Sequence, residues 1–146
     1  MDSIKVISAT PLSGMRLLVT FNNGTTKLYD AHCLLKEFPY FEALENPDIF
    51  GLVTVEPGGY GVSWTPELDT SEGELWVNGI ELPLSAEDLR AFVRRNILST
   101  AEVMEMLGCS RQNVDDMIKR KKISPVKAYP KGNLFMRGEI VQKAGR

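Results

Sequence analysis

Three groups of residues in this chain have types that could carry out chemistry. In the first group, His32 is the single histidine and stands directly before Cys33. Neighbouring side chains rarely face each other as a nucleophile and its base must, so we interpret the pair as a helix-start histidine beside a small buried thiol. The second cysteine, Cys109, lies 76 positions further on, which fits no common spacing of zinc ligands.

The second group is a run of acidic residues, namely Glu67, Asp69, Glu72 and Glu74. Their order differs from the Asp-x-Asp-x-Asp-Gly order of a calcium-binding loop. We interpret the run as a solvated loop. The residues therefore predict no catalytic site, no metal site and no cofactor, and we expect that the protein is not an enzyme.

The third group has the chemistry of nucleic-acid recognition. Arg111, Gln112 and Asn113 are consecutive, and a basic run from Lys119 to Lys122 follows them. Arginine can bind O6 and N7 of guanine, whereas glutamine and asparagine can pair with N6 and N7 of adenine. For the basic run alone, the alternative is a solvated helix end whose charges complement the helix dipole.

The distribution of charge divides the chain in two. The 146 residues have a net charge of −2, but residues 1–86 hold 4 basic and 12 acidic residues, whereas residues 87–146 hold 13 basic and 7 acidic residues. Net charges of −8 and +6 favour two domains with different partners, the basic one being the candidate for nucleic-acid binding. The alternative is a surface whose charge is simply uneven.

The composition narrows the class of protein further. With 43% hydrophobic and 25% charged residues, the chain has the values of an ordinary globular protein. No apolar run approaches the roughly 20 residues that span a bilayer, and the first residues lack the pattern of a secretory signal. Two cysteines give no disulfide framework. We therefore expect a cytoplasmic protein that does not bind membranes.

The acidic half predicts a small antiparallel sheet with one or two short helices, which is an α+β domain. Strand-like runs cover residues 16–21 and 25–29, and Asn23-Gly24 between them is a hairpin signal because both residues tolerate positive φ. The other expected segments are a helix over 31–36 with Asp30 as its N-cap, strands over 50–55 and 60–64, a turn at Gly58-Gly59, and the apolar run Leu75-Trp76-Val77 before a turn at Asn78-Gly79.

Aromatic side chains gather near the predicted turns of this half. Tyrosine and tryptophan are enriched at binding hot spots, although a domain of about 80 residues needs most of its aromatic residues for its core. The candidates for contact with a partner protein, or with a second copy of the chain, are Tyr40, Phe41, Tyr60 and Trp64.

The order of these segments resembles a known family. Lys5-Val6, Leu17 to Phe21, Asn23-Gly24, the segment from Gly58 to Trp64, and Leu68-Asp69 resemble the bacterial family called domain of unknown function 2442, over about residues 3–80. The Gly-Tyr-Gly-apolar-x-Trp segment is the most specific part. The resemblance implies a small α+β domain without established catalytic residues, often encoded beside partner proteins in suspected toxin–antitoxin modules.

The basic half begins with a predicted connecting helix. Ser85 can act as its N-cap, and Leu89, Phe92 and Val93 fall on one face at helical spacing. Asn96 can end this helix.

Two more helices and a β-hairpin are expected after it. Ser99 and Glu102 have the spacing of a capping box, which begins a helix that Gly108 ends with a tight turn. Ser110 caps a second helix, which runs from Arg111 to about residue 121. Expected next are strands over 123–129 and 134–136, a turn over 130–133, and a short helix over 138–143.

The run from residue 98 to about residue 143 resembles the excisionase and MerR-type winged helix-turn-helix family. The matching segments are Leu98 to Val103, Leu107 to Val114 and Ile118 to Ile123. The resemblance implies that the second helix enters the major groove of DNA, that Lys119 and Lys122 lie toward the backbone, and that the hairpin is a wing. The DNA-binding residues that it implies are Ser110, Arg111, Gln112, Asn113, Lys119, Lys122, Lys127, Lys131 and Asn133.

Asp115 and Asp116 depart from the pattern of this family, whose members commonly carry aromatic or basic residues there. A carboxylate on the DNA face repels phosphates, although Asp115 could accept a hydrogen bond from N4 of cytosine. The pair could instead turn this surface toward a protein, and dimerisation could compensate for weak binding by one small module.

The sequence thus predicts an α+β protein with a small antiparallel-sheet domain over 1–82, a connecting helix over 83–97 and a winged helix-turn-helix domain over 98–146. The expected function is that of a transcriptional regulator, either antitoxin-like or a mobile-element autorepressor, which binds double-stranded DNA through its C-terminal domain. The acidic domain is expected to bind a partner protein or a second copy of the chain, which would give a homodimer. The alternative is an inhibitor or adaptor whose acidic domain binds a protein, by masking a basic partner or by mimicking nucleic acid.

Overall fold

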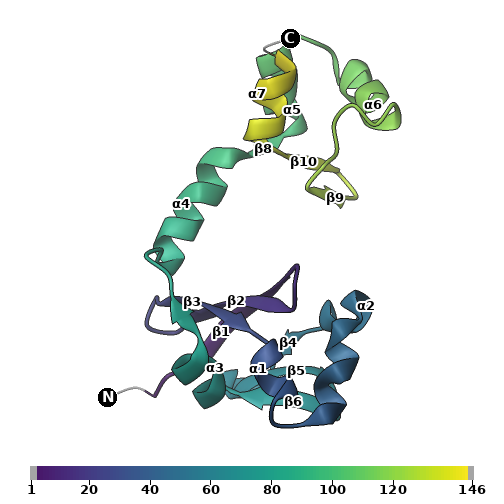
Figure 1. The fold of residues 1–146 in the computed structure, drawn as a ribbon. Coiled ribbons are helices and arrows are strands. Elements are labelled where there is room, and N and C mark those ends of the chain that lie inside the picture. Colours follow the sequence, from purple (N-terminus) through teal and green to yellow (C-terminus); the bar gives the residue numbers. More distant parts are fainter. Residues whose placement is uncertain (1–2, 145–146) are drawn as a thin grey trace. The chain divides into compact units, whose positions relative to one another are not determined.

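The computed structural model describes residues 3–144 and divides into two compact units, Met1–Asp88 and Leu89–Arg146. We call them the acidic unit and the basic unit, because the first holds 14 acidic and 4 basic residues and the second 5 acidic and 13 basic residues. Both combine antiparallel sheet with helices, so the chain has a mixed α+β fold (Figure 1). Within residues 3–144, no helix is long and apolar enough to cross a membrane.

The larger sheet of the acidic unit has the strand order β1-β2-β3-β7 and is antiparallel throughout. Its strands are β1 (Val6–Leu12), β2 (Arg16–Phe21), β3 (Thr26–Asp30) and β7 (Ile80–Glu81). The predicted hairpin at Asn23-Gly24 is confirmed between β2 and β3, and Gly24 is its residue with positive φ, at 87°.

The smaller sheet of this unit has the order β4-β5-β6, with β4 (Thr54–Val55), β5 (Gly61–Thr65) and β6 (Leu68–Ser71). Gly61 is required there, because its φ is 139° and an added Cβ would overlap the carbonyl oxygen of Thr70. The helices are α1 (His32–Leu35), α2 (Pro47–Phe50) and α3 (Glu72–Asn78), with 3-10 helices at Pro39–Glu45 and Pro57–Gly59.

Several expectations for the secondary structure of this unit need correction. The helix predicted over 31–36 with Asp30 as its N-cap is α1, whose N-cap is Ala31. The predicted strand over 50–55 is only β4, since Phe50 ends α2. The run Leu75-Trp76-Val77 lies in α3, which Ser71 caps by accepting a hydrogen bond from the Glu74 N–H at 3.1 Å. In the acidic run, Asp69 accordingly lies in β6 and Glu72 and Glu74 lie in α3, whereas Glu67 lies in the turn before β6.

The core of the acidic unit is one cluster of buried apolar residues. It takes alternate residues of β2, namely Leu17, Val19 and Phe21, as period-2 strand geometry requires. Tyr29 of β3 is fully buried, and its hydroxyl donates a hydrogen bond to Glu74 Oε2 of α3 at 2.8 Å. This bond satisfies a polar group that the core would otherwise leave unpaired.

α4 (Ala86–Asn96) begins in the acidic unit and ends in the basic unit. The predicted cap is confirmed: Ser85 Oγ accepts from the Asp88 N–H at 3.1 Å, and Asp88 Oδ2 accepts from the Ser85 N–H at 2.9 Å. Residues just before and at the start of α4 bond to the acidic unit, for example Ala86 N to the Gly24 carbonyl at 2.9 Å. The division between the units therefore falls after Asp88, inside the helix.

The basic unit has a three-stranded antiparallel sheet in the order β8-β10-β9 and three further helices. Its elements are β8 (Ile97–Ser99), α5 (Thr100–Leu107), α6 (Arg111–Lys119), β9 (Lys127–Tyr129), β10 (Gly132–Met136) and α7 (Arg137–Ala144). α5 packs against α6, α7, β8 and β10. The core of the unit comprises Leu98, Val103, Val114, Ile123, Phe135 and Ile140.

Candidate nucleic-acid interface

The sequence between α5 and α6 fixes a tight turn between the two helices. Ser99 and Glu102 form the predicted capping box at the start of α5, with hydrogen bonds of 3.2 and 3.0 Å between each side chain and the other's backbone N–H. The hydrogen bond from the Ser99 N–H lowers the pKa of the Glu102 carboxyl. Gly108, which was predicted to form the tight turn after α5, has a left-handed conformation with φ at 63°. Ser110 then caps α6 by accepting from the Asn113 N–H at 3.2 Å.

α6 buries one face and exposes the other. Val114 is fully buried, and Met117 and Ile118 pack beside it against the core of the basic unit. Residues at i, i+3 and i+4 share one face of a helix, so Gln112 and Lys119 lie near the centre of the opposite, exposed face.

The three predicted base-reading residues do not form one continuous row. Successive helical residues are turned by about 100°, so Arg111 and Asn113 lie on opposite flanks of α6 with Gln112 facing outward between them. All three are exposed. A partner that contacted Arg111, Gln112 and Asn113 together would have to surround α6 on both flanks, as the major groove of DNA surrounds a bound helix.

Asn113 lies in an open groove of about 700 Å³ that α6 forms with the end of α5 and with α7. Among its lining residues are Asp116, Arg120 and Lys122. The structure thus brings Asn113 and Lys122 together, whereas Arg111 does not line this groove.

The end of α6 holds a lysine in a conformation that favours glycine. The Lys121 N–H donates to the Ile118 carbonyl at 3.0 Å, and the Lys122 N–H donates to the Met117 carbonyl at 2.9 Å. This pair of bonds is the Schellman motif, in which glycine is the usual residue after the C-cap. Here that residue is Lys121, with φ at 58°. Position 121 therefore carries a cationic side chain although glycine would adopt this backbone conformation with less strain.

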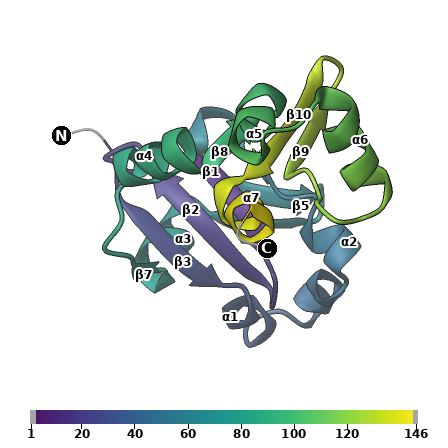
Figure 2. The same cartoon turned by 90° about the horizontal axis from the view of Figure 1, so that it is seen from above.

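The β9–β10 hairpin follows α6 through the buried Ile123. In Figures 1 and 2, α6 and this hairpin lie on the same side of the α5–α7 pair. Lys127 pairs with Leu134, and both Lys127 and Lys131 are exposed. The strand predicted over 123–129 is shorter than expected, since β9 begins at Lys127.

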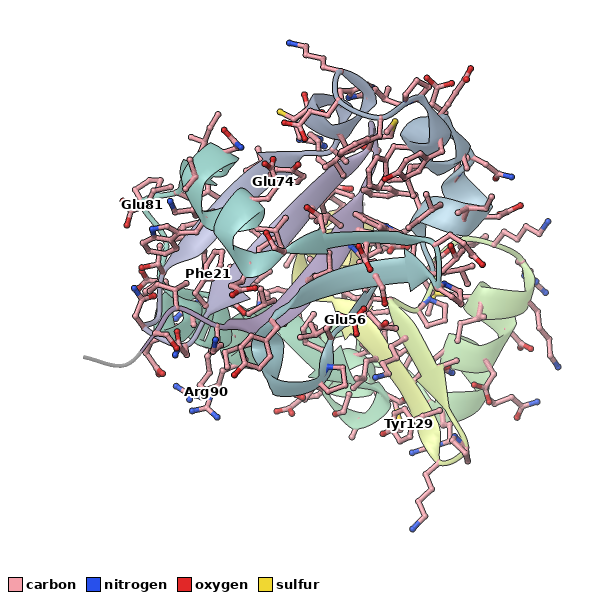
Figure 3. All side chains as sticks on the ribbon, turned by 90° about the horizontal axis from the view of Figure 1, so that it is seen from below. Phe21, Glu56, Glu74, Glu81, Arg90 and Tyr129 are labelled. Atoms are coloured by element: carbon pink, nitrogen blue, oxygen red, sulfur yellow. The ribbon has the colours of Figure 1, made fainter. Side chains whose placement is uncertain are left out.

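Two residues of the hairpin differ in their exposure. Asn133 shares a face of β10 with the buried Phe135, two positions away, and is half-buried. Tyr129 lies near the tip of the hairpin (Figure 3) and is 45% exposed. The hairpin therefore exposes the Tyr129 ring between Lys127 and Lys131 in the sequence, and Asn133 is the least accessible of the residues predicted to contact DNA.

The segment from Ser110 to Asn133 holds seven basic and two acidic residues, so its net charge is +5. The acidic residues are Asp115, which is exposed, and Asp116, which is half-buried. Asp115 and Asp116 lie on either side of the centre of the exposed face of α6, which Gln112 and Lys119 occupy. Asp115 precedes Lys119 by four residues, and Asp116 precedes Arg120 by four residues. This spacing permits side-chain pairs along a helix, and in net terms the two acids offset two of the seven positive charges of the segment.

The residues predicted for protein contact divide into two pairs. Phe41 and Trp64 are 3% and 5% exposed and belong to the core of the acidic unit, which corrects the expectation that a partner reaches them. Tyr40 and Tyr60 are 56% and 60% exposed. Tyr40 stacks on the exposed Phe38, with ring centroids 5.4 Å apart.

His32 faces an acid rather than a thiol. Its Nδ1 lies 2.6 Å from Asp30 Oδ1, which also accepts from the His32 backbone N–H at 3.0 Å. Burial opposes ionisation of Asp30, but these hydrogen bonds outweigh it and lower the pKa of its carboxyl. Within residues 3–144, no group of three or more His, Cys, Asp or Glu side chains is placed to hold a metal ion. Cys33 is an exposed free thiol, which corrects the expectation of a buried one, and Cys109 is a half-buried free thiol.

Sequence reasoning missed several residues of these surfaces. Arg120 and Lys121 belong to the noted basic run, but their roles in the groove and the Schellman motif depend on where α6 ends. Tyr129 and Phe38 were each visible as aromatic residues beside a proline, a context that favours turns.

Comparison with known proteins identifies the first half of the chain. Residues 6–81 match the family described as "Protein of unknown function (DUF2442)". This match covers more than half of the 146 residues, so the chain belongs to that family, and the predicted resemblance of the acidic half is confirmed. No curated protein matches the chain.

One solved structure is similar over most of the chain. It is the crystal structure of "Putative DNA Binding Protein NE0471" from Nitrosomonas europaea ATCC 19718, with 24% sequence identity and a TM-score of 0.46. The similarity covers 86% of this chain and 84% of that chain.

Proposed function

We propose that the basic unit is a winged helix-turn-helix domain that binds double-stranded DNA, and that the chain is a transcriptional regulator. The observation that carries this proposal is the exposed face of α6, which is capped by Ser110, followed by a basic hairpin and set in a segment of net charge +5. A nine-residue helix with polar residues at its start fits the major groove, and the flanking cations suit phosphates.

In this proposal the residues have separate roles. Arg111 and Gln112 read base edges, while Asn113 contacts DNA on the far flank of α6. Ser110 lies near a phosphate at the helix start. The basic residues after α6 and in the hairpin contact the backbone, namely Lys119, Arg120, Lys121, Lys122, Lys127 and Lys131. We also propose that the chain represses its own operon, as an antitoxin-like protein would, and that it has no enzymatic activity.

Arg111 gives the sharpest test. Binding is measured by fluorescence anisotropy of the full chain on a duplex from upstream of its own gene and on a scrambled duplex. Arg111→Ala is expected to cost about 1–3 kcal/mol on the upstream duplex and to reduce the preference for it. Arg111→Lys keeps the charge but loses bidentate recognition, so it should retain the salt dependence and lose preference.

The matched control is Lys36→Ala, which removes an exposed cation from the acidic unit and should change neither affinity. Equal discrimination by the native chain, Arg111→Ala and Arg111→Lys would remove Arg111 from base reading.

A second candidate function concerns the acidic unit. We infer that it binds a partner protein through the stacked, exposed rings of Phe38 and Tyr40, since a stacked aromatic pair on the surface is typical of a binding hot spot. The test is affinity capture with the full chain and with Phe38→Ala/Tyr40→Ala, followed by identification of bound proteins. The control is Val77→Ala, at a residue 75% exposed. A partner that both variants retain would contradict this inference.

A further inference from the structure

α4 has an apolar face that is left open to solvent. Leu89, Phe92 and Val93 have the i, i+3, i+4 spacing of one helical face, yet no residue of α4 is buried. Phe92 is 51% exposed and Val93 is 52% exposed, while Leu89 is half-buried. Such a face normally packs against another element, so its exposure indicates a missing partner.

The charges of α4 show what kind of partner fits. Asp88 and Arg95 are both exposed and lie seven residues apart, which places them on the same flank of the apolar face. Their signs are opposite, and they stand at opposite ends of the helix. Arg94 adds a second cation at the end where Arg95 lies.

We propose that a second copy of the chain covers this face, with the two α4 helices antiparallel about a two-fold axis. In an antiparallel two-fold pair, the same flank of the apolar face meets in both copies, and the start of one helix lies beside the end of the other. Asp88 of each copy therefore lies opposite Arg95 of the other copy. In a parallel two-fold pair, unlike flanks meet, so the Asp88 and Arg95 side chains of the two copies would lie on opposite sides of the interface and could not pair. The charge pattern therefore favours the antiparallel arrangement, and the apolar residues of the two copies meet between the two ion pairs.

The size of α4 limits the strength of this dimer. Eleven residues form a helix of about 16 Å. A contact between two such helices is smaller than the roughly 1,200–2,000 Å² of standard stable interfaces. We therefore expect reversible association with a dissociation constant in the micromolar range, which does not rest on the proposed DNA binding. If that function holds, the dimer would present two basic units to a two-fold symmetric operator.

The experiment is sedimentation equilibrium of the full chain without DNA, from about 1 to about 100 µM. The expected result is a shift with concentration from the monomer mass of 16.3 kDa toward twice that mass. Val93→Glu should weaken the dimer at least tenfold. Val141→Glu is the matched control, since Val141 on α7 is 51% exposed, and it should leave association unchanged.

Asp88→Asn and Arg95→Gln test the orientation of the helices. Asp88→Asn keeps a side-chain oxygen that can accept from the Ser85 N–H, so the cap of α4 is preserved. In the antiparallel dimer each variant loses two ion pairs and should bind roughly two- to tenfold more weakly. In a parallel dimer these ion pairs do not exist, so both variants would associate as the native chain does, which would overturn the arrangement. A monomer at all concentrations, or a dimer that Val93→Glu leaves intact, would overturn the proposal.

Discussion

The acidic and basic units differ in the size of their apolar cores. Among the described residues, the core cluster of the acidic unit contains 15 buried apolar residues, whereas that of the basic unit contains six. Both units also have hydrogen bonds between side chains and backbone, such as Asn22 Nδ2 to the Ser3 carbonyl in the acidic unit and Arg137 Nε to the Arg95 carbonyl in the basic unit, both at 2.9 Å.

This difference shows where residue type is informative. In the acidic unit, aromatic residues such as Trp64 are mostly needed for the core, so their presence in the sequence does not mark a binding surface. In the basic unit the core is small, and the polar side chains at the start of α6 are exposed and do not belong to it. Their exposure therefore carries more information about function.

The largest expected effect tests the small core of the basic unit. Phe135 is 1% exposed and belongs to its cluster of six. Phe135→Ala should cost about 3–5 kcal/mol, because it leaves a cavity that so few neighbours cannot fill. Hydrogen exchange should then rise in residues 97–144 and not in the acidic unit. Val126→Ala, at a residue 53% exposed, is the control, and equal losses from both variants would contradict the comparison.

The second prediction concerns the acids on α6. If the exposed face of α6 contacts DNA, Asp115→Asn/Asp116→Asn removes repulsion from phosphates and should raise affinity about tenfold at low salt. Glu105→Gln, on α5, removes one charge from the same unit and should have a smaller effect. Anisotropy titrations measure both. Lower affinity in the double variant would place these carboxylates in recognition rather than in repulsion.

The third prediction tests the acidic unit by pH. Burial, followed by the hydrogen bond and charge of Glu74, raises the pKa of Tyr29 far above its ordinary value. Below about pH 10, the Tyr29 hydroxyl is protonated in both the folded and the unfolded chain, and its contribution to stability is fully present. Above about pH 10, only the unfolded chain releases this proton, so the free energy of unfolding falls as the pH rises. Unfolding by urea should show a loss of up to about 1.4 kcal/mol per pH unit above about pH 10.

Tyr29→Phe should remove most of that pH dependence. Tyr60→Phe is the matched control, since Tyr60 is 60% exposed, and it should keep the dependence of the native chain. Identical slopes for all three proteins would assign the alkaline loss to other groups.

The smallest expected effect is at the end of α6. Lys121→Gly relieves a left-handed lysine and should stabilise the basic unit by up to about 1 kcal/mol, while DNA binding weakens slightly. Lys119→Gly, inside the helix, should instead destabilise the unit by about 1 kcal/mol. Thermal unfolding distinguishes the two, and a loss of stability in both variants would show that Lys121 is not strained.

Features with local causes were predictable from the sequence. The capping bonds of Ser85, Ser99 and Ser110 and the turn at Gly108 depend on residues within four positions of one another. The hairpin at Asn23-Gly24 is local in the same way.

Features with distant causes were not predictable. β8 was missed because Ile97–Ser99 becomes a strand only by pairing with Leu134–Met136. A short apolar run such as residues 50–55 fits either a strand or a helix. Phe50 is helical because α2 begins at Pro47, after the Asn46 cap. The candidate site followed the same rule. Arg111 and Lys119 were visible in the sequence, but the burial of Val114 is what places Arg111 on a flank of α6 and Lys119 near the centre of its exposed face.

The most direct test of the central claim is the affinity of the full chain for DNA from upstream of its gene and for unrelated DNA, measured across a series of salt concentrations. We expect tighter binding to the upstream DNA and a steep fall of affinity with salt, because the protein contacts phosphates and reads a base sequence. Weak binding that is equal for both DNAs would contradict it, and the exposed aromatic pair of the acidic unit would then be the surface to pursue.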